Sequence, residues 1–374
     1  MRFLSLGLTL LATVSIARAE NGVYPDTIVI GQSVALSGPA SGLGTGMREG
    51  AAAYFDEVNR NGGVHGRKIE LKTLDDGYEP DRAAANTRKL IEDERVFALF
   101  GYVGTPTSQA SIPIFTAAKV PFFGAFTGAE LLRDPFNKYI FNVRASYYDE
   151  TEKIVQHLTT ASLEKIAVMY QNDSYGKAGL AGVERAMAKR NLKIVATGTV
   201  ERNTTDVAAA VKSIGAAQPD AVVMVSAYRS CAEFIRQAKK AGIKSQFFNV
   251  SFVGTKSLAD DLGAEGVGVA ISQVMPFPWG AEAVVRDYQR AMTRANPQSA
   301  LGYTSMEGYV SARVFVEGLR RTGKDLTRDK LIAELERISQ FDVGGFVVSF
   351  APANHGGSKY VDLTIIGKGN KLVR

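Results

Sequence analysis

The chain has 374 residues, of which 45% are hydrophobic, and a formal net charge of +6. Its basic and acidic residues are interspersed without a basic run, which argues against a nucleic-acid-binding surface. The single cysteine, Cys231, excludes an internal disulfide, and we expect it to be a small buried residue.

The first 19 residues have the pattern of a secretory signal peptide. A positive start at Arg2 precedes an almost wholly apolar segment, 3–16, and the tripeptide Ala-Arg-Ala at 17–19 supplies the small residues that signal peptidase reads. An uncleaved membrane anchor is the alternative, but the apolar segment is shorter than the ~20 residues that span a bilayer. We therefore predict cleavage before Glu20 and a periplasmic mature chain, which is long enough for two lobes.

Short β-branched segments then alternate with longer helical ones. In chain order, the first half predicts strands at 27–36, 68–74, 96–100 and 120–123, separated by helices at 47–61, 81–93 and 108–118. Asp81, which follows Pro80, is expected to cap its helix. This alternation is typical of a parallel sheet covered by helices on both faces, with ligands at the carboxyl ends of the strands.

The same alternation starts again at Lys165. It predicts strands at 166–170, 193–200, 221–226 and 246–250 and helices at 176–190, 207–214, 231–241, 281–295 and 306–322. Two similar halves in tandem predict an α/β fold with two lobes of one architecture and a cleft between them.

We find no catalytic or metal-binding motif. His65, His157 and His355 lie far apart, and none has a second metal-type ligand at i+3 or i+4, so we expect structural or solvated roles. The glycine-rich segment 42–46 lacks the G-x-G-x-x-G spacing of a dinucleotide site. We interpret it as a turn that lets a ligand approach the backbone at a helix N-terminus. The sequence therefore predicts a protein that is not an enzyme and needs no cofactor or metal.

Two segments have the composition of an anion-binding site. Residues 101–109 (GYVGTPTSQ) and 124–130 (GAFTGAE) each run from a predicted strand into a predicted helix, which places hydroxyls and free amides at a helix start. Thr105, Ser108 and Thr127 could instead serve only as helix caps. Because the two segments follow neighbouring strands, we favour one shared site for a carboxylate.

The sequence resembles the branched-chain amino-acid (Leu/Ile/Val-type) periplasmic binding proteins that supply ABC importers. The matching stretches, spread over nearly all of the mature chain, are IGQSVALSGPASGLG, NRNGGVHGRKIELKTLDD, GTPTSQA, FTGAELL, QNDSYGKAG and FIRQAKKAGIKSQFF. The resemblance implies the type I periplasmic binding fold, in which two Rossmann-like lobes are joined by three hinge crossovers. It implies one lobe of residues 20–144 plus 276–350 and another of residues 145–275 plus 351–374.

The resemblance also implies a ligand site. Thr105 and Thr127 match the hydroxyls that hold the ligand carboxylate, and Ala125 matches a backbone contact beside them. Tyr175 and Tyr228 match aromatic residues of the second lobe that close over the ligand.

Further aromatic residues could surround an apolar or aromatic body of the ligand. The candidates are Tyr102, Phe126, Tyr147, Tyr148, Tyr175 and Tyr228, of which only Tyr175 and Tyr228 also match family positions. Such residues can equally pack inside a lobe.

Five positions depart from the family pattern, of which two, Leu43 and Leu301, stand where relatives have aromatic residues. Tyr78 and Gly104 stand where close relatives have a disulfide, and Ser251 stands where the family has the acid that pairs with the ligand α-ammonium. An ammonium buried without a counter-charge costs more than the about 1.5–3 kcal/mol that a charge-assisted hydrogen bond contributes. Either Asp149 or Asp173 substitutes for that acid, or the ligand is a carboxylate without an α-amino group.

We therefore expect a solute-binding protein. It would capture a small carboxylate-bearing ligand, a branched-chain-type amino acid or a related organic acid, and deliver it to the permease subunits of an ABC importer. The alternative is a ligand-sensing receptor subunit of the same fold, which reports a small amide or acid to a signalling partner. We expect a monomer without a nucleic-acid partner.

Overall fold

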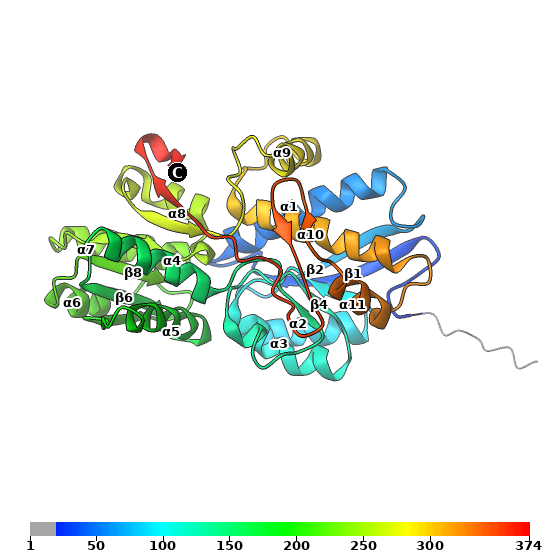
Figure 1. Ribbon diagram of the computed structural model, residues 1–374, viewed down its shortest axis with the longest axis horizontal. Coiled ribbons are helices and arrows are strands. Elements are labelled where there is room, and N and C mark those ends of the chain that lie inside the picture. The colour runs from blue at the N-terminus through cyan, green and yellow to red at the C-terminus, as the bar shows by residue number, and fades with distance from the viewer. Residues whose placement is uncertain (1–19) are drawn as a thin grey trace, which may run out of the picture.

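The computed structural model describes residues 20–374, which form two α/β lobes, each built around its own sheet (Figure 1). The predicted α/β class and two-lobed architecture are confirmed. The predicted signal peptide lies outside the described residues. The division of the chain between the lobes at the predicted residue numbers stays a prediction.

The first sheet is parallel and has the strand order β2-β1-β3-β4-β5. Its strands are β1 (Thr27–Val34), β2 (Lys68–Asp75), β3 (Ala98–Phe100), β4 (Phe122–Phe123) and β5 (Ile140–Phe141). Strand β1, which lies between β2 and β3, is buried along almost its whole length, because helices cover both faces of the sheet. These helices are α1 (Ser41–Arg60), α2 (Pro80–Glu92), α3 (Thr105–Ala117), α9 (Ala283–Ala295), α10 (Tyr303–Thr322) and α11 (Arg328–Glu336).

The second sheet has the order β14-β13-β10-β9-β8-β6-β7. Its five parallel strands are β6 (Ile166–Gln171), β7 (Thr197–Val200), β8 (Ala221–Val225), β9 (Gln246–Asn249) and β10 (Ala270–Gln273). Two antiparallel strands, β13 (Asp362–Ile366) and β14 (Leu372–Val373), extend one edge. The helices of this lobe are α4 (Tyr147–Thr160), α5 (Ser174–Ala188), α6 (Ala208–Ala216), α7 (Tyr228–Lys240) and α8 (Thr255–Leu262).

Short elements complete the chain. They are the 3-10 turns η1 (Glu130–Leu132), η2 (Ser251–Val253), η3 (Gly263–Gly266) and η4 (Lys368–Asn370) and the hairpin strands β11 (Phe341–Asp342) and β12 (Val347–Val348). Sheet membership shows that the chain passes from one lobe to the other between β5 and β6, returns after β10, and crosses again before β13. In Figure 1 the first lobe therefore combines blue, cyan, yellow (α9) and orange segments, whereas the second combines green, yellow-green and red.

The strand order of each sheet reverses at one point. The reversals lie between β1 and β3 and between β6 and β8, and the loops after these strands leave the carboxyl ends of the sheets. Ligands of open α/β sheets bind at such reversal points. The two lobes also share a hydrophobic cluster, in which Leu43, Tyr78 and Phe126 of the first lobe pack with residues of the second.

The glycine-rich segment is not the turn that the sequence predicted. Helix α1 begins at Ser41, so residues 42–46 lie in its first turns. A Cβ atom on Gly44 would lie 2.0 Å from the carbonyl oxygen of Ala35, and one on Gly50 would lie 1.8 Å from the carbonyl oxygen of Ser305. These glycines are therefore required for close packing of α1 against its neighbours.

Two predicted helix starts are also wrong. Pro80 is the first residue of α2 and Glu79 is its N-cap, so Asp81 lies inside the first turn and does not cap the helix. Thr127 does not begin an α-helix, because only the three-residue turn η1 follows it.

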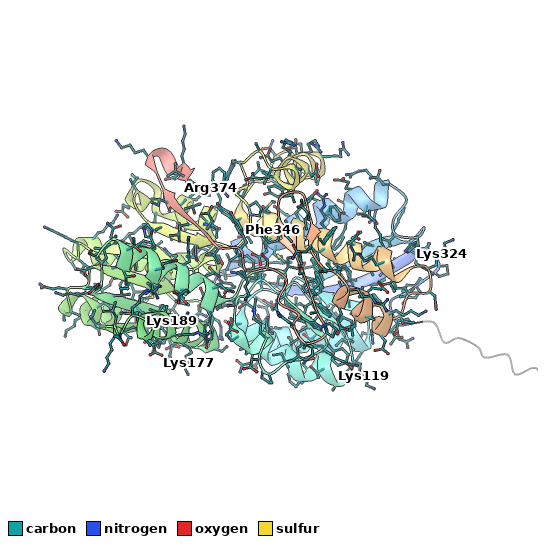
Figure 2. The ribbon with its side chains drawn as sticks, in the orientation of Figure 1. Lys119, Lys177, Lys189, Lys324, Phe346 and Arg374 are labelled. Atoms are coloured by element: carbon teal, nitrogen blue, oxygen red, sulfur yellow. The ribbon has the colours of Figure 1, made fainter. Side chains whose placement is uncertain are left out.

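Basic residues are distributed over the surface of both lobes. Four exposed lysines illustrate this: Lys119 and Lys324 lie on the first lobe, and Lys177 and Lys189 lie on the second (Figure 2). Within residues 20–374, no helix has both the length and the apolar character needed to cross a bilayer.

Candidate functional site

The two predicted threonines meet at the carboxyl end of the first sheet. Thr105 is the first residue of α3, directly after β3, and Thr127 follows β4. Their Oγ1 atoms are 2.6 Å apart, and Thr127 also donates to the Tyr147 hydroxyl at 3.1 Å. Both threonines are fully buried. The structure thus brings together the hydroxyls of two loops that are 22 residues apart in sequence.

Neither threonine caps a helix with its side chain. The N-cap of α3 is Gly104, whose φ of +103° favours glycine. A Cβ atom on Gly104 would lie 2.2 Å from Cε2 of Tyr78, so the tyrosine ring packs directly on the glycine. Tyr78 and Gly104 therefore make a ring-on-backbone contact here.

A group of buried aromatic rings lies between the lobes. The Tyr175 ring, at the start of α5, is 4.5 Å from the Phe252 ring and 5.5 Å from the Tyr147 ring. Phe252 in turn lies 5.4 Å from Phe126 and 5.8 Å from Tyr78. We call these five residues the aromatic group.

The Tyr175 hydroxyl has no hydrogen-bond partner within the described residues, although it is fully buried. Burial raises its pKa well above the ordinary value, so the hydroxyl is neutral and can donate. An unpaired buried hydroxyl costs about 1–3 kcal/mol, so a ligand that accepts a hydrogen bond from Tyr175 would recover this cost.

The remaining predicted residues fall into two sets. The Tyr228 hydroxyl accepts from the Gly42 amide at 3.4 Å and thereby joins α7 to the first turn of α1. The carbonyl of Ala125 accepts from the Thr127 amide at 2.9 Å, which shapes the turn beside the threonine pair. Tyr102 lies elsewhere: its hydroxyl bonds to Thr87 at 3.0 Å inside the first lobe, so the structure separates it from the other candidates.

Ser251 belongs to a buried ion network that sequence reasoning missed. Arg144, between β5 and α4, is completely buried and bonds to the Ser251 hydroxyl and, at 2.7 Å, to Glu150. The Glu150 carboxylate also accepts from the Ser251 amide at 2.8 Å and from Ser272 at 2.5 Å. The guanidinium lies 5.3 Å from the centre of the Phe126 ring, which places the network against the aromatic group.

Glu307, on α10, faces the same arginine from the first lobe. Its carboxylate is 3.4 Å from Nη1 of Arg144, a longer contact than that of Glu150. Burial, together with the negative charge of Glu150, outweighs the attraction of Arg144 and raises the pKa of Glu307 to about 7. Arg144 therefore connects the first lobe, the second lobe and the segment between them.

The two acids proposed to replace the missing carboxylate have other roles. Asp149 and Ser146 form a reciprocal capping box at the start of α4. Asp173 caps α5 by accepting from the amides of Tyr175 and Gly176.

A second set of polar contacts joins the lobes beside the aromatic group. Arg202, after β7, pairs with Glu79 at 2.7 Å, and Asn203 donates to Glu79 at 2.7 Å and to the carbonyl of Gly77 at 3.1 Å. We call these four residues the interlobe latch.

A family model described as a periplasmic binding protein matches residues 27–370. The chain belongs to the periplasmic binding protein family. Members of this family are substrate-binding proteins and not enzymes, which confirms the sequence-based prediction. Within residues 20–374, no group of three or more His, Cys, Asp and Glu side chains could hold a metal ion.

Among curated relatives, this periplasmic binding protein is 27% identical to the Leu/Ile/Val-binding protein homolog 7 of Brucella abortus, with 83% of this chain and 82% of that protein aligned. It is 23% identical to the leucine-specific-binding protein of Salmonella typhimurium over 78% of this chain and 86% of that one. The crystal structure of a possible leucine/isoleucine/valine-binding protein from Rhodopirellula baltica superposes with a TM-score of 0.89, at 35% identity over 96% of this chain and 98% of that one. The predicted resemblance is confirmed.

Proposed function

We propose that this periplasmic binding protein captures a small carboxylate-bearing solute between its lobes and delivers it to the permease of an ABC importer. The observation that supports this most directly is the pair of buried hydroxyls of Thr105 and Thr127, which Tyr147 links to the ring of Tyr175, whose hydroxyl is unpaired among the described residues. Hydroxyl donors from two lobes can enclose an anion and stabilise the closed form. The relatives named for Leu/Ile/Val binding support a small amino-acid-like or acid ligand.

Export is part of the proposal. The signal peptide would be removed before Glu20, which leaves that residue as the mature N-terminus. The Glu20 side chain accepts from the Arg328 amide at 3.1 Å, so the chain is held against α11 from this residue onward. The mass of the mature protein recovered from the periplasm tests the cleavage position.

The ligand site is tested with a pair of threonine variants. Thr127→Ala removes a hydroxyl from the proposed site, and we expect about a tenfold loss of ligand affinity by calorimetry, in line with a lost hydrogen bond to a charged group. Thr87→Ala is the matched control, because Thr87 is equally buried but bonds to Ala83 and Ser111 inside the first lobe. Equal affinities for the two variants would refute the site.

A further inference from the structure

We propose that the bound solute is a hydrophobic carboxylate that lacks an α-amino group, and that the Arg144–Glu150–Ser251 network sets this preference. The inference rests on the proposed function, since it concerns the same site between the lobes. The two alternatives for Ser251 are that Asp149 or Asp173 replaces the family's acid, or that the ligand lacks an α-amino group. The hydrogen bonds that the buried charged groups already make favour the second.

A buried ammonium group needs a carboxylate with free acceptor positions. Glu150 is the carboxylate in contact with Ser251, and an ionised carboxylate offers about four lone-pair positions. All of them are occupied: Oε1 accepts from Arg144 and from the Ser251 hydroxyl at 3.0 Å, and Oε2 accepts from the Ser251 amide and from Ser272. Glu150 therefore has no position left for a ligand ammonium.

Asp149 and Asp173 are engaged as well, whereas Glu307 accepts, within residues 20–374, only from Nη1 of Arg144, at 3.4 and 3.5 Å. Asp149 accepts from the amide and hydroxyl of Ser146 at 3.0 and 3.1 Å. Asp173 caps α5 with one oxygen, and its other oxygen accepts from Gln171 at 2.6 Å and pairs with Arg202 at 3.3 Å. Each would have to lose part of a helix cap or an ion pair in order to bind an ammonium.

Two of the buried groups without partners among the described residues are donors of the aromatic group and the network, although the amide oxygens of Asn142 and Asn249 also lack partners. Besides the Tyr175 hydroxyl, the Nε–H group of Arg144 is buried and has no partner among the described residues. The guanidinium keeps its positive charge, because Glu307 and Glu150 raise the pKa of Arg144 although burial opposes the charge. Glu150 and Glu307 compensate this charge, so what the network offers a ligand carboxylate is one unpaired donor, the Nε–H group of Arg144.

The aromatic group matches the apolar part of such a ligand. The buried Phe252 ring lies 4.5 Å from the Tyr175 ring and 5.4 Å from the Phe126 ring, and the Arg144 guanidinium lies over Phe126. Aromatic side chains bury large apolar areas, so a ligand body that leaves water at this point gains hydrophobic free energy.

Calorimetry with matched ligand pairs tests the inference on the full mature protein. The pairs are 4-methylpentanoate with leucine and 3-phenylpropanoate with phenylalanine, which differ only in the α-amino group. We expect the amine-free member of at least one pair to bind about tenfold or more tightly than its amino acid. An amino acid that binds as tightly as its partner, or more tightly, would overturn the inference and leave the proposed carboxylate capture intact. Binding of neither member of either pair would count against both.

A variant at Ser251 tests whether the network sets the preference for ligands without an α-amino group. Ser251→Asp places a new carboxylate beside the network, so we expect the ratio of affinities within a pair to move toward the amino acid by about tenfold. Ser213→Asp is the control and should keep the wild-type preference, because it adds the same charge at an exposed position of α6, outside the network. An unchanged ratio in the folded Ser251→Asp variant would contradict the role of the network. If that variant does not fold, the wild-type pairs decide the question alone.

Discussion

Glu307 shows how one buried residue can make the stability of the protein depend on pH. Its pKa rises from 4.5 to about 7 because burial and the charge of Glu150 oppose its ionisation more than Arg144 favours it. Between these values the folded protein retains a proton that the unfolded chain releases. The free energy of unfolding therefore falls as pH rises through this range, by up to about 1.4 kcal/mol per pH unit.

We expect Glu307→Gln to flatten this dependence, because the amide cannot ionise. Denaturant titrations at pH 5, 6, 7 and 8 measure the slope, and Asp76, whose pKa burial raises to about 6, contributes the same background to every variant. Glu317→Gln is the control, since Glu317 lies on the same helix and is paired with Arg321 nearer the surface. Parallel slopes for the wild type and Glu307→Gln would show that the buried carboxyl titrates normally.

At the scale of elements, the start of α3 depends on the contact between Gly104 and Tyr78. The glycine has a positive φ and no space for a side chain, whereas Gly62, with a similar φ of +92°, has nothing within 4 Å of an added Cβ atom. Substitutions at the two glycines therefore distinguish the cost of backbone strain from the cost of steric overlap. Since Thr105 follows Gly104 directly, this contact also positions the threonine pair.

We expect Gly104→Ala to destabilise the protein by about 1–3 kcal/mol more than Gly62→Ala does. Both variants impose a left-handed conformation on alanine, but only the first overpacks a buried ring. Chemical denaturation measures the difference. Equal losses of stability would mean that Tyr78 moves aside without cost, and that the contact does not hold the start of α3.

At the scale of the whole molecule, the lobes are held together by contacts that do not involve the threonine pair. The interlobe latch connects the loop after β2 with the loop after β7, and the Tyr78 hydroxyl accepts from Gln171 of the second lobe at 3.2 Å. Such contacts form only when the lobes are close, so they favour the closed form before any ligand contact is counted.

We expect Arg202→Ala to lower ligand affinity by a factor of about two to five, because partly exposed ion pairs contribute about 0.2–1 kcal/mol. Arg190→Ala is the matched control: both arginine side chains are 23% exposed, but Arg190 pairs with Glu152 inside the second lobe. Calorimetry measures the affinity, and small-angle scattering measures the opening of the free protein. If Arg202→Ala has the same ligand affinity and the same radius of gyration as Arg190→Ala, the interlobe latch has no role in closure.

Element types were predictable from sequence because the residues that define them are close together in the chain. The alternation of buried strands and amphipathic helices gave β1, β2, α2 and β6 near their observed bounds. The start of α1 was missed, since its glycines suggest a turn when read alone. Gly44 is needed because the carbonyl oxygen of Ala35 lies where a Cβ atom would stand, and only the folded chain brings these two groups together.

By itself, the sequence determined the α/β class, the two lobes and the convergence of Thr105 and Thr127, because period and strand adjacency are local properties. Only the tertiary structure decided which charges surround Ser251. Arg144 is 107 residues from Ser251 and 163 from Glu307, and no spacing rule connects such positions. Burial strengthens the interactions between these charges, and it results from the packing of the lobes and not from any one segment.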